Sequence, residues 1–304
     1  IGKYMYISDQ SFTNIAKLFP ISQTPFTLMR GQNAYFTPSS PSLYRKNKLN
    51  SEDYRLLSRL RACEFMLTFR HHPVVNEIRM NCMVEDMAIA QHYEFPTEYI
   101  DITNNKWVAA FFAATYKYGD FYLPTETGFD KGIGVFYISN DDMNISFFEK
   151  MHIVGFQFFQ RPTKQFSMVY HMDAKENFDD NPNFKRIVFR HDIVASKQVY
   201  DVAYKQRRFF PNDILAQKAN AIRDAHYEYS KFAFEICRAF GWTKMVDKEL
   251  SDVLMKNGHN YHDHKYIKVG FTEDEVKCDI ENWNNYGREH LKSLILPIIP
   301  VYNL

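Results

Sequence analysis

The pattern of hydrophobic and polar positions is clearest between residues 85 and 115. Apolar side chains recur at helical spacing over residues 85–92, so this segment is predicted to be a helix. Pro96 ends that helix, because the residue before a proline is forced out of the α-helical region. Residues 99–102 are short, apolar and β-prone, and they are predicted to form a strand.

A second helix is predicted directly afterwards, over residues 107–115. Asn104 and Asn105 provide turn and capping side chains, and the helix is apolar on nearly every side, so we expect it to be buried. Six polar residues stand among these apolar neighbours: Gln91, His92, Thr97, Asp101, Thr103 and Asn104. Buried polar groups must be hydrogen-bonded, so these side chains either hold the turns together or line a pocket.

The rest of the chain mixes helix and strand over its first two thirds and is helical in its last third. Strands are predicted at 26–29, 132–138, 166–170 and 184–189. Helices are predicted at 7–19, 51–71, 212–239, 246–255 and 272–294, with Pro73 ending the second of them. Loops are predicted at 33–50, 140–160 and 174–183. We therefore predict an α+β fold with three parts: a helical lead-in over 1–24, a mixed domain over 25–222 and a helical C-terminal extension over 223–304.

Composition narrows the class of protein. The 304 residues carry a net charge of +1, so no overall field favours nucleic acid or acidic lipid. The cysteines are far apart and form no Cys-x-x-Cys pair, which favours free thiols in a reducing, cytoplasmic compartment. No run of about 18 apolar residues occurs, so no membrane-spanning helix and no membrane partner are expected. The chain begins with Ile1 rather than Met, which leaves open what precedes it.

Arg30 is the first candidate for chemistry. It follows the strand predicted at 26–29, and Gly31 after it allows close backbone approach or a positive φ. The guanidinium group offers a fixed fork of donors that matches phosphate or carboxylate. We interpret Arg30, Gly31, Gln32 and Asp101 as a site for an anionic ligand. The alternative is a buried ion pair of Arg30 with Asp101 or a glutamate.

His92 and Asp101 are the second candidate. A histidine beside a carboxylate has a fixed tautomer and a pKa suited to proton transfer. The alternative is a histidine that holds the turn at Pro96 through backbone hydrogen bonds.

Two further stretches carry weaker signals. The loop at 33–50 is basic, with Arg45, Lys46 and Lys48, and it could contact nucleic acid. Residues 259–264 contain three histidines and one aspartate, a spacing that could bind zinc. No fourth ligand is fixed by the sequence, so we favour a solvated loop and expect no metal.

Five blocks of residues occur in an order that resembles the FRG domain, a mostly bacterial module named for its Phe/Tyr-Arg-Gly motif. The blocks are Met29-Arg30-Gly31-Gln32, Pro41-Ser42-Leu43-Tyr44-Arg45, the central stretch from Ala90-Gln91-His92-Tyr93 to Ala109-Ala110-Phe111-Phe112-Ala113, Arg161 with Gln165, and Phe209-Phe210-Pro211-Asn212-Asp213. The resemblance covers about residues 25–222. Four positions depart from the family's usual residues: Met29 replaces an aromatic residue, Glu94 a glycine, Glu98 an arginine and Ile102 a tryptophan.

The resemblance implies a bacterial effector, a toxin or a phage-defence component, located in the cytoplasm or delivered as an effector, with an unknown macromolecular target. By analogy, the order of Arg30, Thr103 and Gln165 is similar to the arginine, hydroxyl and glutamate-or-glutamine order of NAD-consuming ADP-ribosyltransferase-like folds. On this interpretation Arg30, Gly31, Gln32 and Asp101 hold NAD, and the catalytic residues are His92, Thr103 and Gln165.

Three alternatives remain open within this interpretation. Gln165 cannot act as a base, so Glu94 and Glu98 are alternatives for the catalytic carboxylate. The domain could also be a scaffold without catalysis. It could instead be a module that recognises protein or nucleic acid through the basic 33–50 loop and exposed tyrosines.

Overall fold

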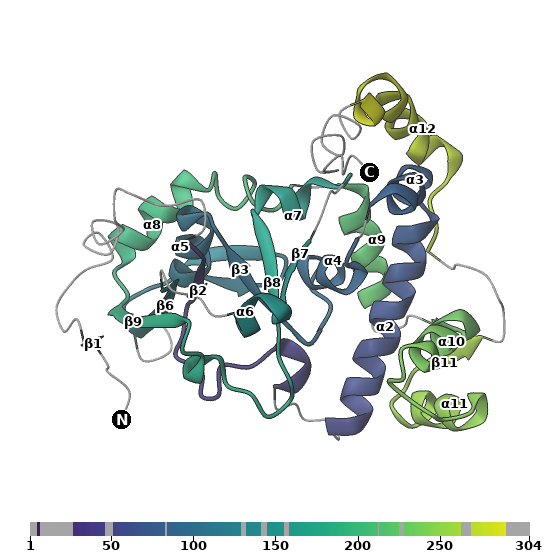
Figure 1. The fold of residues 1–304 in the computed structure, drawn as a ribbon, viewed down its shortest axis with the longest axis horizontal. Helices are drawn as coiled ribbons and strands as arrows, with labels where there is room; N and C mark the ends of the chain where they lie inside the picture. Colours follow the sequence, from purple (N-terminus) through teal and green to yellow (C-terminus); the bar gives the residue numbers. More distant parts are fainter. Residues whose placement is uncertain are drawn as a thin grey trace, which may run out of the picture. The chain divides into compact units, whose positions relative to one another are not determined.

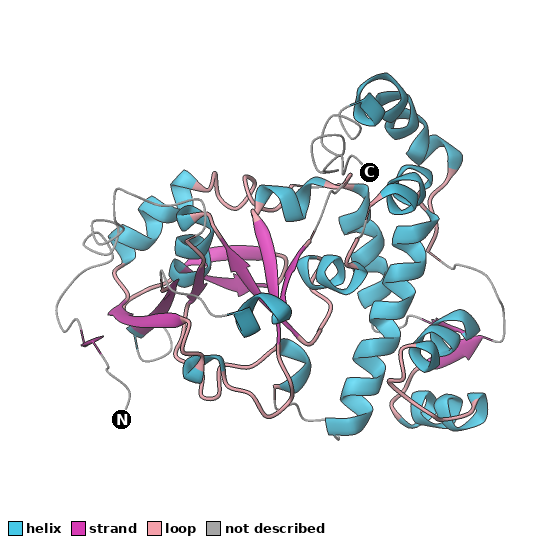
Figure 2. Ribbon diagram, viewed as in Figure 1, coloured by secondary structure: helices cyan, strands magenta, loops and turns pink. Residues whose placement is uncertain are grey.

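The structure is a computed structural model, and it describes residues 5–6, 27–45, 51–82, 84–128, 132–140, 145–154, 158–211, 213–224, 228–262 and 269–289 (Figure 1). Contacts divide the chain into two compact units, residues 1–62 with 85–213 and residues 63–84 with 214–304. Helices and strands are mixed in the first unit (Figure 2), so the predicted α+β class is confirmed. The domain limits predicted from the sequence stay a prediction, and the helix predicted at 7–19 lies outside the described residues. No helix in the described part of the chain is long and apolar enough to cross a membrane.

A mixed sheet forms the centre of the first unit. Its described strands run in the order β1 (Met5–Tyr6), β9 (Phe184–Arg190), β6 (Ile133–Ser139), β2 (Met29–Gln32), β3 (Tyr99–Thr103), β8 (Ser167–His171) and β7 (Met151–Ile153). β1 is parallel to β9, and the other neighbouring pairs are antiparallel. All predicted strands are present. β2 is shifted toward the C-terminus, so Arg30 lies inside a strand rather than after one.

Each face of the sheet has its own core, because successive side chains of a strand point to opposite faces. On β6, Phe136 packs into the core that contains α5 (Lys106–Ala114) and α8 (Ile193–Val202). Its neighbours Val135 and Tyr137 belong to the core on the other face, together with Phe147 of α6 (Ile145–Lys150). The described parts of 140–160 thus contain a helix and a strand, and the prediction of an irregular loop there is wrong.

The helix α5 lies against β2 with no room for a side chain between them. A Cβ atom on Gly31 would lie 1.8 Å from the carbonyl oxygen of Ala109, so the glycine serves close approach of the two backbones. Asn105 caps α5, because its side-chain oxygen accepts hydrogen bonds from the backbone N–H groups of Trp107 and Val108. The predicted buried helix and its cap are confirmed.

The remaining elements of the first unit surround the sheet. They are η1 (Ser42–Tyr44), α4 (Asp86–His92), the hairpin of β4 (Thr115–Tyr118) and β5 (Phe121–Pro124), α7 (Gln160–Lys164) and η3 (Phe178–Asp180). The prediction of a helix over 85–92 is confirmed by α4. The loop predicted at 174–183 contains η3, and it inserts Phe178 into the second core rather than lying wholly at the surface.

The helix α2 (Ser51–His71) has the predicted bounds, with residues 51–62 in the first unit and 63–71 in the second. Pro73 ends it as predicted. The same proline is the first residue of α3 (Pro73–Asn81), because proline fits the first turn of a helix, where its missing N–H has no helical partner.

The second unit is mainly helical in its described residues. It contains α3, α9 (Ile214–Arg223), α10 (Lys231–Ala239), α11 (Asp247–Lys256), α12 (Glu273–Asn282) with a π-helical turn over Trp283–Gly287, and the parallel pair β10 (Glu228–Ser230) and β11 (Asn260–His262). The predicted helices at 246–255 and, as far as residue 289, 272–294 are confirmed.

The single long helix predicted over 212–239 is wrong. Ser230 pairs in β10, and its hydroxyl caps α10 by accepting a hydrogen bond from the Ala233 N–H group. The Ser230 N–H group donates to the buried carboxylate of Glu64 at 2.5 Å. These tertiary contacts outweigh the helical spacing of the apolar residues on either side.

Candidate functional site

A cleft in the first unit brings together all seven site residues predicted from the sequence. Two cavities of about 250 and 290 Å³ form it. They share the lining residues Arg30, Arg45, His92, Asp101, Phe112, Lys117, Tyr122 and Gln165, which define what we call the Arg30 cleft. Gly31, Gln32 and Thr103 line the first cavity. The combined volume lies within the range of ordinary ligand pockets, roughly 300–1,000 Å³.

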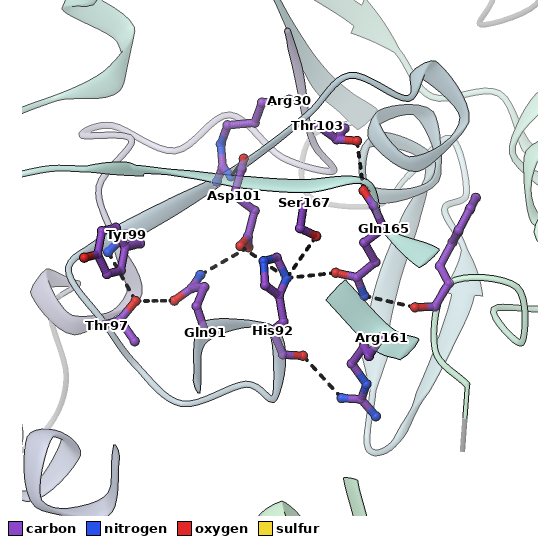
Figure 3. Close-up of polar contacts among 11 residues, drawn as sticks. Arg30, Gln91, His92, Thr97, Tyr99, Asp101, Thr103, Arg161, Gln165 and Ser167 are labelled. Carbon is purple, nitrogen blue, oxygen red and sulfur yellow. Dashed lines mark hydrogen bonds and ion pairs between the residues drawn. The ribbon is translucent and has the colours of Figure 1, made fainter. Parts of the chain in front are cut away.

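Arg30 projects from β2 toward Asp101 in the middle of β3 (Figure 3). Its Nη1 group donates a hydrogen bond to the backbone carbonyl oxygen of Asp101 at 2.9 Å, whereas its Nε group is buried without a partner. Burial lowers the pKa of the Arg30 guanidinium to about 10, and the nearby Asp101 carboxylate opposes this effect. The group therefore stays cationic at neutral pH. Within the described residues Arg30 forms no ion pair within 4.0 Å, so the alternative of a structural ion pair is not what the structure contains.

His92 is the last residue of α4, and its side chain is almost completely buried. Its Nδ1 atom lies 3.0 Å from Gln165 Oε1 and 3.4 Å from Ser167 Oγ. The turn at Pro96 is held by other groups, so the alternative role of the imidazole as a backbone clamp is wrong. Burial lowers the pKa of His92 below its ordinary value, and Asp101 and Gln165 act against that effect. A neutral imidazole at pH 7 follows.

Gln165 fixes the tautomer of this imidazole. Its Nε2 group donates to the carbonyl oxygen of Phe209 at 3.1 Å, so its Oε1 atom is the one that faces His92. A carbonyl oxygen can only accept, so His92 Nδ1 carries the proton and Nε2 carries the lone pair. The Nε2 atom is buried and has no hydrogen-bond partner among the described residues.

Asp101 lies beside the imidazole and is held from its other side. Its Oδ1 atom is 3.7 Å from His92 Nδ1 and has no hydrogen-bond partner in the described part of the chain. Its Oδ2 atom accepts a hydrogen bond from Gln91 Nε2 at 3.1 Å. Gln91 in turn accepts one from Thr97 at 2.5 Å, and Thr97 accepts one from the Tyr99 N–H group at 3.2 Å. This chain of contacts orients the carboxylate and closes the Pro96 turn (Figure 3).

Thr103 and Gln165 are committed to internal contacts. The Thr103 hydroxyl donates to the backbone carbonyl oxygen of Gln165 at 2.9 Å and accepts from the Asn105 N–H group at 3.0 Å. Both ends of the Gln165 amide are also occupied. These two side chains are therefore built to position His92, and their predicted catalytic roles stay predictions.

Gly31 and Gln32 also have structural tasks. Gly31 allows the approach of α5, as described above. Gln32 is buried, and its amide nitrogen donates to Ser39 Oγ at 2.7 Å. Their predicted contact with NAD stays a prediction.

The two glutamates that replace the usual family residues have different surroundings. Glu94 lines the second cavity, pairs with Lys117, and has a φ of 71°, in the left-handed region that favours the glycine usual at this position. Glu98 instead accepts two hydrogen bonds from Arg59, at 2.7 and 3.1 Å, and does not line the cleft. Of the two alternatives for a catalytic carboxylate, only Glu94 is in place.

Arg161 supports the cleft from behind. Its guanidinium lies 4.8 Å from the centre of the Tyr93 ring and 5.5 Å from that of Phe210, and its Nη1 group donates to the His92 carbonyl oxygen at 3.4 Å. The two late sequence blocks of the FRG resemblance, at Arg161 with Gln165 and at Phe209, thus pack around His92 of the central block.

Several lining residues were not predicted from the sequence. They are Phe36, Phe112, Lys117, Tyr122, Ser167 and Phe210. Lys117 and Tyr122 belong to the β4–β5 hairpin, and Phe112 belongs to a helix whose apolar pattern indicates only burial. The one available signal was the high aromatic content of the chain, 16%, which does not show which rings face a cavity.

The structure gives no test of the zinc hypothesis for residues 259–264. No group of three or more His, Cys, Asp or Glu side chains that could hold a metal occurs among the described residues. Asp263 and His264 lie outside them, as do Lys46 and Lys48 of the basic loop.

Comparison with known proteins identifies one family. Residues 27–120 match the family model of the FRG domain, which confirms the predicted FRG domain over this part of the chain, while its predicted extent to residue 222 stays a prediction. The match includes Arg30, His92, Asp101 and Thr103, whereas Gln165 follows it in the chain. No curated protein and no solved structure matches the chain.

Proposed function

The chain contains an FRG domain over residues 27–120, and we propose that its Arg30 cleft binds NAD and cleaves the bond between nicotinamide and ribose, passing the ADP-ribosyl group to water or to an acceptor. The observation that carries the proposal is a set of three buried polar atoms without partners in the described chain. They are Arg30 Nε, His92 Nε2 and Asp101 Oδ1, and all three residues line one cleft. Buried polar groups are nearly always satisfied, so a bound ligand is the natural source of the missing partners.

The lining of the cleft suits a ligand with both phosphates and rings. Arg30 and Arg45 supply positive charge, and their guanidinium groups match phosphate geometry, whereas the charge of Lys117 is paired with Glu94. Phe112 and Tyr122 supply flat apolar surface for a base or a nicotinamide ring. Two cavities that share Arg30 and Arg45 fit a dinucleotide, whose two ring systems flank a central pyrophosphate.

Asp101 and His92 supply the groups for the reaction, and both line the same two cavities. When the N-glycosidic bond breaks, its electron pair leaves on neutral nicotinamide, and positive charge develops on the ribose. The free Oδ1 atom of Asp101 is a negative group suited to stabilise that charge. Water then adds to the anomeric carbon, and its proton passes to His92 Nε2, which carries a lone pair in the assigned tautomer. In hydrolysis the products are nicotinamide, ADP-ribose and one proton.

A thermal shift measurement with NAD, followed by chromatography of released nicotinamide, tests the proposal. A ligand present at about 100 times its Kd stabilises the native state by about 2.7 kcal/mol, so NAD raises the melting temperature of the wild-type protein. The Arg30→Gln variant loses the shift and the turnover because it lacks the cationic fork. The Asp101→Asn variant keeps the shift and loses turnover.

Arg186→Gln is the matched control. Arg186 is also a partly buried arginine of the sheet, but it pairs with Asp179 at 2.8 Å and does not line the cleft. It keeps both the shift and the turnover. The absence of any shift at millimolar NAD, with folded wild-type protein, would overturn the proposal, as would an Arg186→Gln variant that loses the shift as fully as Arg30→Gln.

A further inference from the structure

The first unit has a second hollow, which the proposed NAD reaction does not use. It is a broad groove of about 1450 Å³. We call it the basic groove and define it by Lys164, Phe166, Tyr204, Lys205, Arg207 and Arg208. Its wall comes from the end of α7 and from the turn that follows α8.

Four cations of the basic groove are exposed and unpaired. The side chains of Lys164, Lys205, Arg207 and Arg208 form no hydrogen bond and no ion pair within the described residues, and Asp201 is the acidic residue of the described lining. Some other cations of this unit are neutralised by a partner, as Arg59 is by Glu98 and Arg186 by Asp179. The groove therefore concentrates positive charge on a chain whose net charge is only +1.

Two aromatic rings stand exposed in the same groove. Phe166 is 52% exposed and Tyr204 is 70% exposed. Both have left-handed backbone conformations, with φ of 49° and 47°, which bulky residues rarely adopt. These exposed rings contribute little to the core, and their backbone conformation is strained. The packing of this unit therefore does not explain why bulky residues stand at these two positions.

The turn that carries Tyr204 is fixed rather than loose. Lys205 and Gln206 continue the left-handed conformation, with φ of 51° and 73°. The Gln206 side-chain oxygen accepts a hydrogen bond from the Tyr122 N–H group at 2.6 Å, which ties the turn to the β4–β5 hairpin. Tyr204 and the three cations from Lys205 to Arg208 are thereby held on one rigid turn.

We propose that the basic groove binds single-stranded nucleic acid. Proteins of this kind combine a positive groove that follows the phosphates with aromatic rings on which bases stack. Unpaired bases can reach Tyr204 and Phe166, whereas the bases of a duplex are already stacked on one another. The inference is independent of the proposed NAD reaction, although Ser167 lines both the basic groove and the Arg30 cleft.

The test is fluorescence anisotropy with a fluorescein-labelled oligothymidylate and the full chain, without NAD, over a series of salt concentrations. If four cations each neutralise one phosphate, the logarithm of the association constant falls with the logarithm of salt concentration with a slope of about −3. In the variant with Arg207→Ala and Arg208→Ala the slope falls in magnitude by about 1.4. Tyr204→Ala weakens binding at least about fivefold, because one stacked base is lost.

Matched controls come from the same unit. Tyr118 is 69% exposed, and Lys185 and Arg190 are exposed cations on β9, but none of the three lines the groove. Tyr118→Ala and the pair Lys185→Ala with Arg190→Ala leave binding unchanged, and thermal unfolding checks that every variant is folded.

Four results would overturn the inference. They are no binding of oligothymidylate at low salt, equal losses in the control and groove variants, equal affinity for a duplex, and equally effective competition by polyglutamate. The last result would assign the groove to an acidic protein instead.

Discussion

The Nδ1 atom of His92 lies 3.0 Å from the Oε1 atom of Gln165, and this contact determines which nitrogen of the imidazole is left for chemistry. The amide cannot turn over, because its Nε2 group is bonded to the carbonyl oxygen of Phe209. The contact joins the end of α4 to the residue that follows α7, which are far apart in the chain. Gln165 is therefore a positioning residue, and changing its charge changes the acid–base behaviour of His92.

The first prediction concerns Gln165→Glu. A carboxylate in contact with Nδ1 favours the protonated imidazole, so the pKa of His92 rises by about 1 to 3 units relative to the wild type. If neutral His92 is the base for NAD cleavage, the acid limb of the pH–rate profile moves to higher pH by the same amount. Imidazole NMR of the same variant measures the pKa shift without relying on activity.

Gln198→Glu is the control for this prediction. Gln198 is an exposed residue of α8 outside the cleft, so the same change in charge there leaves the profile in place. A shifted imidazole pKa with an unshifted pH–rate profile would show that His92 is not the base.

The second prediction concerns stability in mild acid. The pKa of His92 is lowered in the folded protein, chiefly by burial, from an ordinary value of 6.5. Below that value the unfolded chain takes up a proton that the folded protein resists, so stability falls as pH falls and levels off below the folded pKa. The slope from this group is at most about 1.4 kcal/mol per pH unit.

The variant His92→Phe removes this contribution. Its loss of stability between about pH 7.5 and about pH 5.5 is smaller than that of the wild type, as measured by urea unfolding at each pH. His72 has a lowered pKa as well and contributes in the same direction in both proteins, so the difference between them isolates His92. Parallel pH curves for the two proteins would contradict the prediction.

The central block could be predicted because its signals are local. The helical spacing before His92 and the cap at Asn105 each act within a few residues, and α4, β3 and α5 follow. The predicted stop at Pro96 is wrong, because α4 ends at His92 and the chain already turns at the left-handed Glu94. The long helix over 212–239 failed for the opposite reason. The helix α9 ends at Arg223, and Ser230 is held in β10 by Glu64 and by the pairing with β11, neither of which can be read from the residues nearby.

The candidate site also divides into residues with local sequence signals and residues placed by contacts between distant segments. The polar residues of the central block and Arg30 stood out because polar side chains among apolar neighbours require partners. The sequence could not reveal that the Thr103 hydroxyl is consumed by Gln165, or that Lys117 and Tyr122 reach the cleft from a hairpin. Those facts depend on how distant segments pack together.

The third prediction concerns Gly31→Ala. The added Cβ atom would lie 1.8 Å from the Ala109 carbonyl oxygen and 2.8 Å from the Ala113 nitrogen, both of which are backbone atoms. Neither can move unless α5 shifts away from β2, so the cost lies at the upper end of overpacking, about 3 kcal/mol or more. The melting temperature measures it.

Gly119→Ala is the comparison for that substitution. Gly119 has a positive φ of 59° and open space around its Cβ position. Its loss is therefore left-handed strain of about 1–2 kcal/mol, offset by about 0.4–1 kcal/mol because alanine restricts the unfolded chain, or about 1 kcal/mol in all. Equal losses at the two glycines would show that α5 and β2 are not packed as closely as the structure has them.

The last prediction concerns Glu94, a residue in a conformation that favours glycine. Both Glu94→Ala and Glu94→Gly remove the ion pair with Lys117, which is partly exposed and worth at most about 1 kcal/mol. Only glycine also relieves the left-handed strain, which stabilises the folded state by about 1–2 kcal/mol. Glycine also gives the unfolded chain more freedom, which lowers the stability of that variant by about 0.4–1 kcal/mol. Glu94→Gly is therefore more stable than Glu94→Ala by about 1 kcal/mol in urea unfolding. If glycine also matched or exceeded the wild type in NAD-induced thermal shift, Glu94 would have no part in the cleft; a weaker shift in both variants would show that the strained glutamate is kept for the ligand.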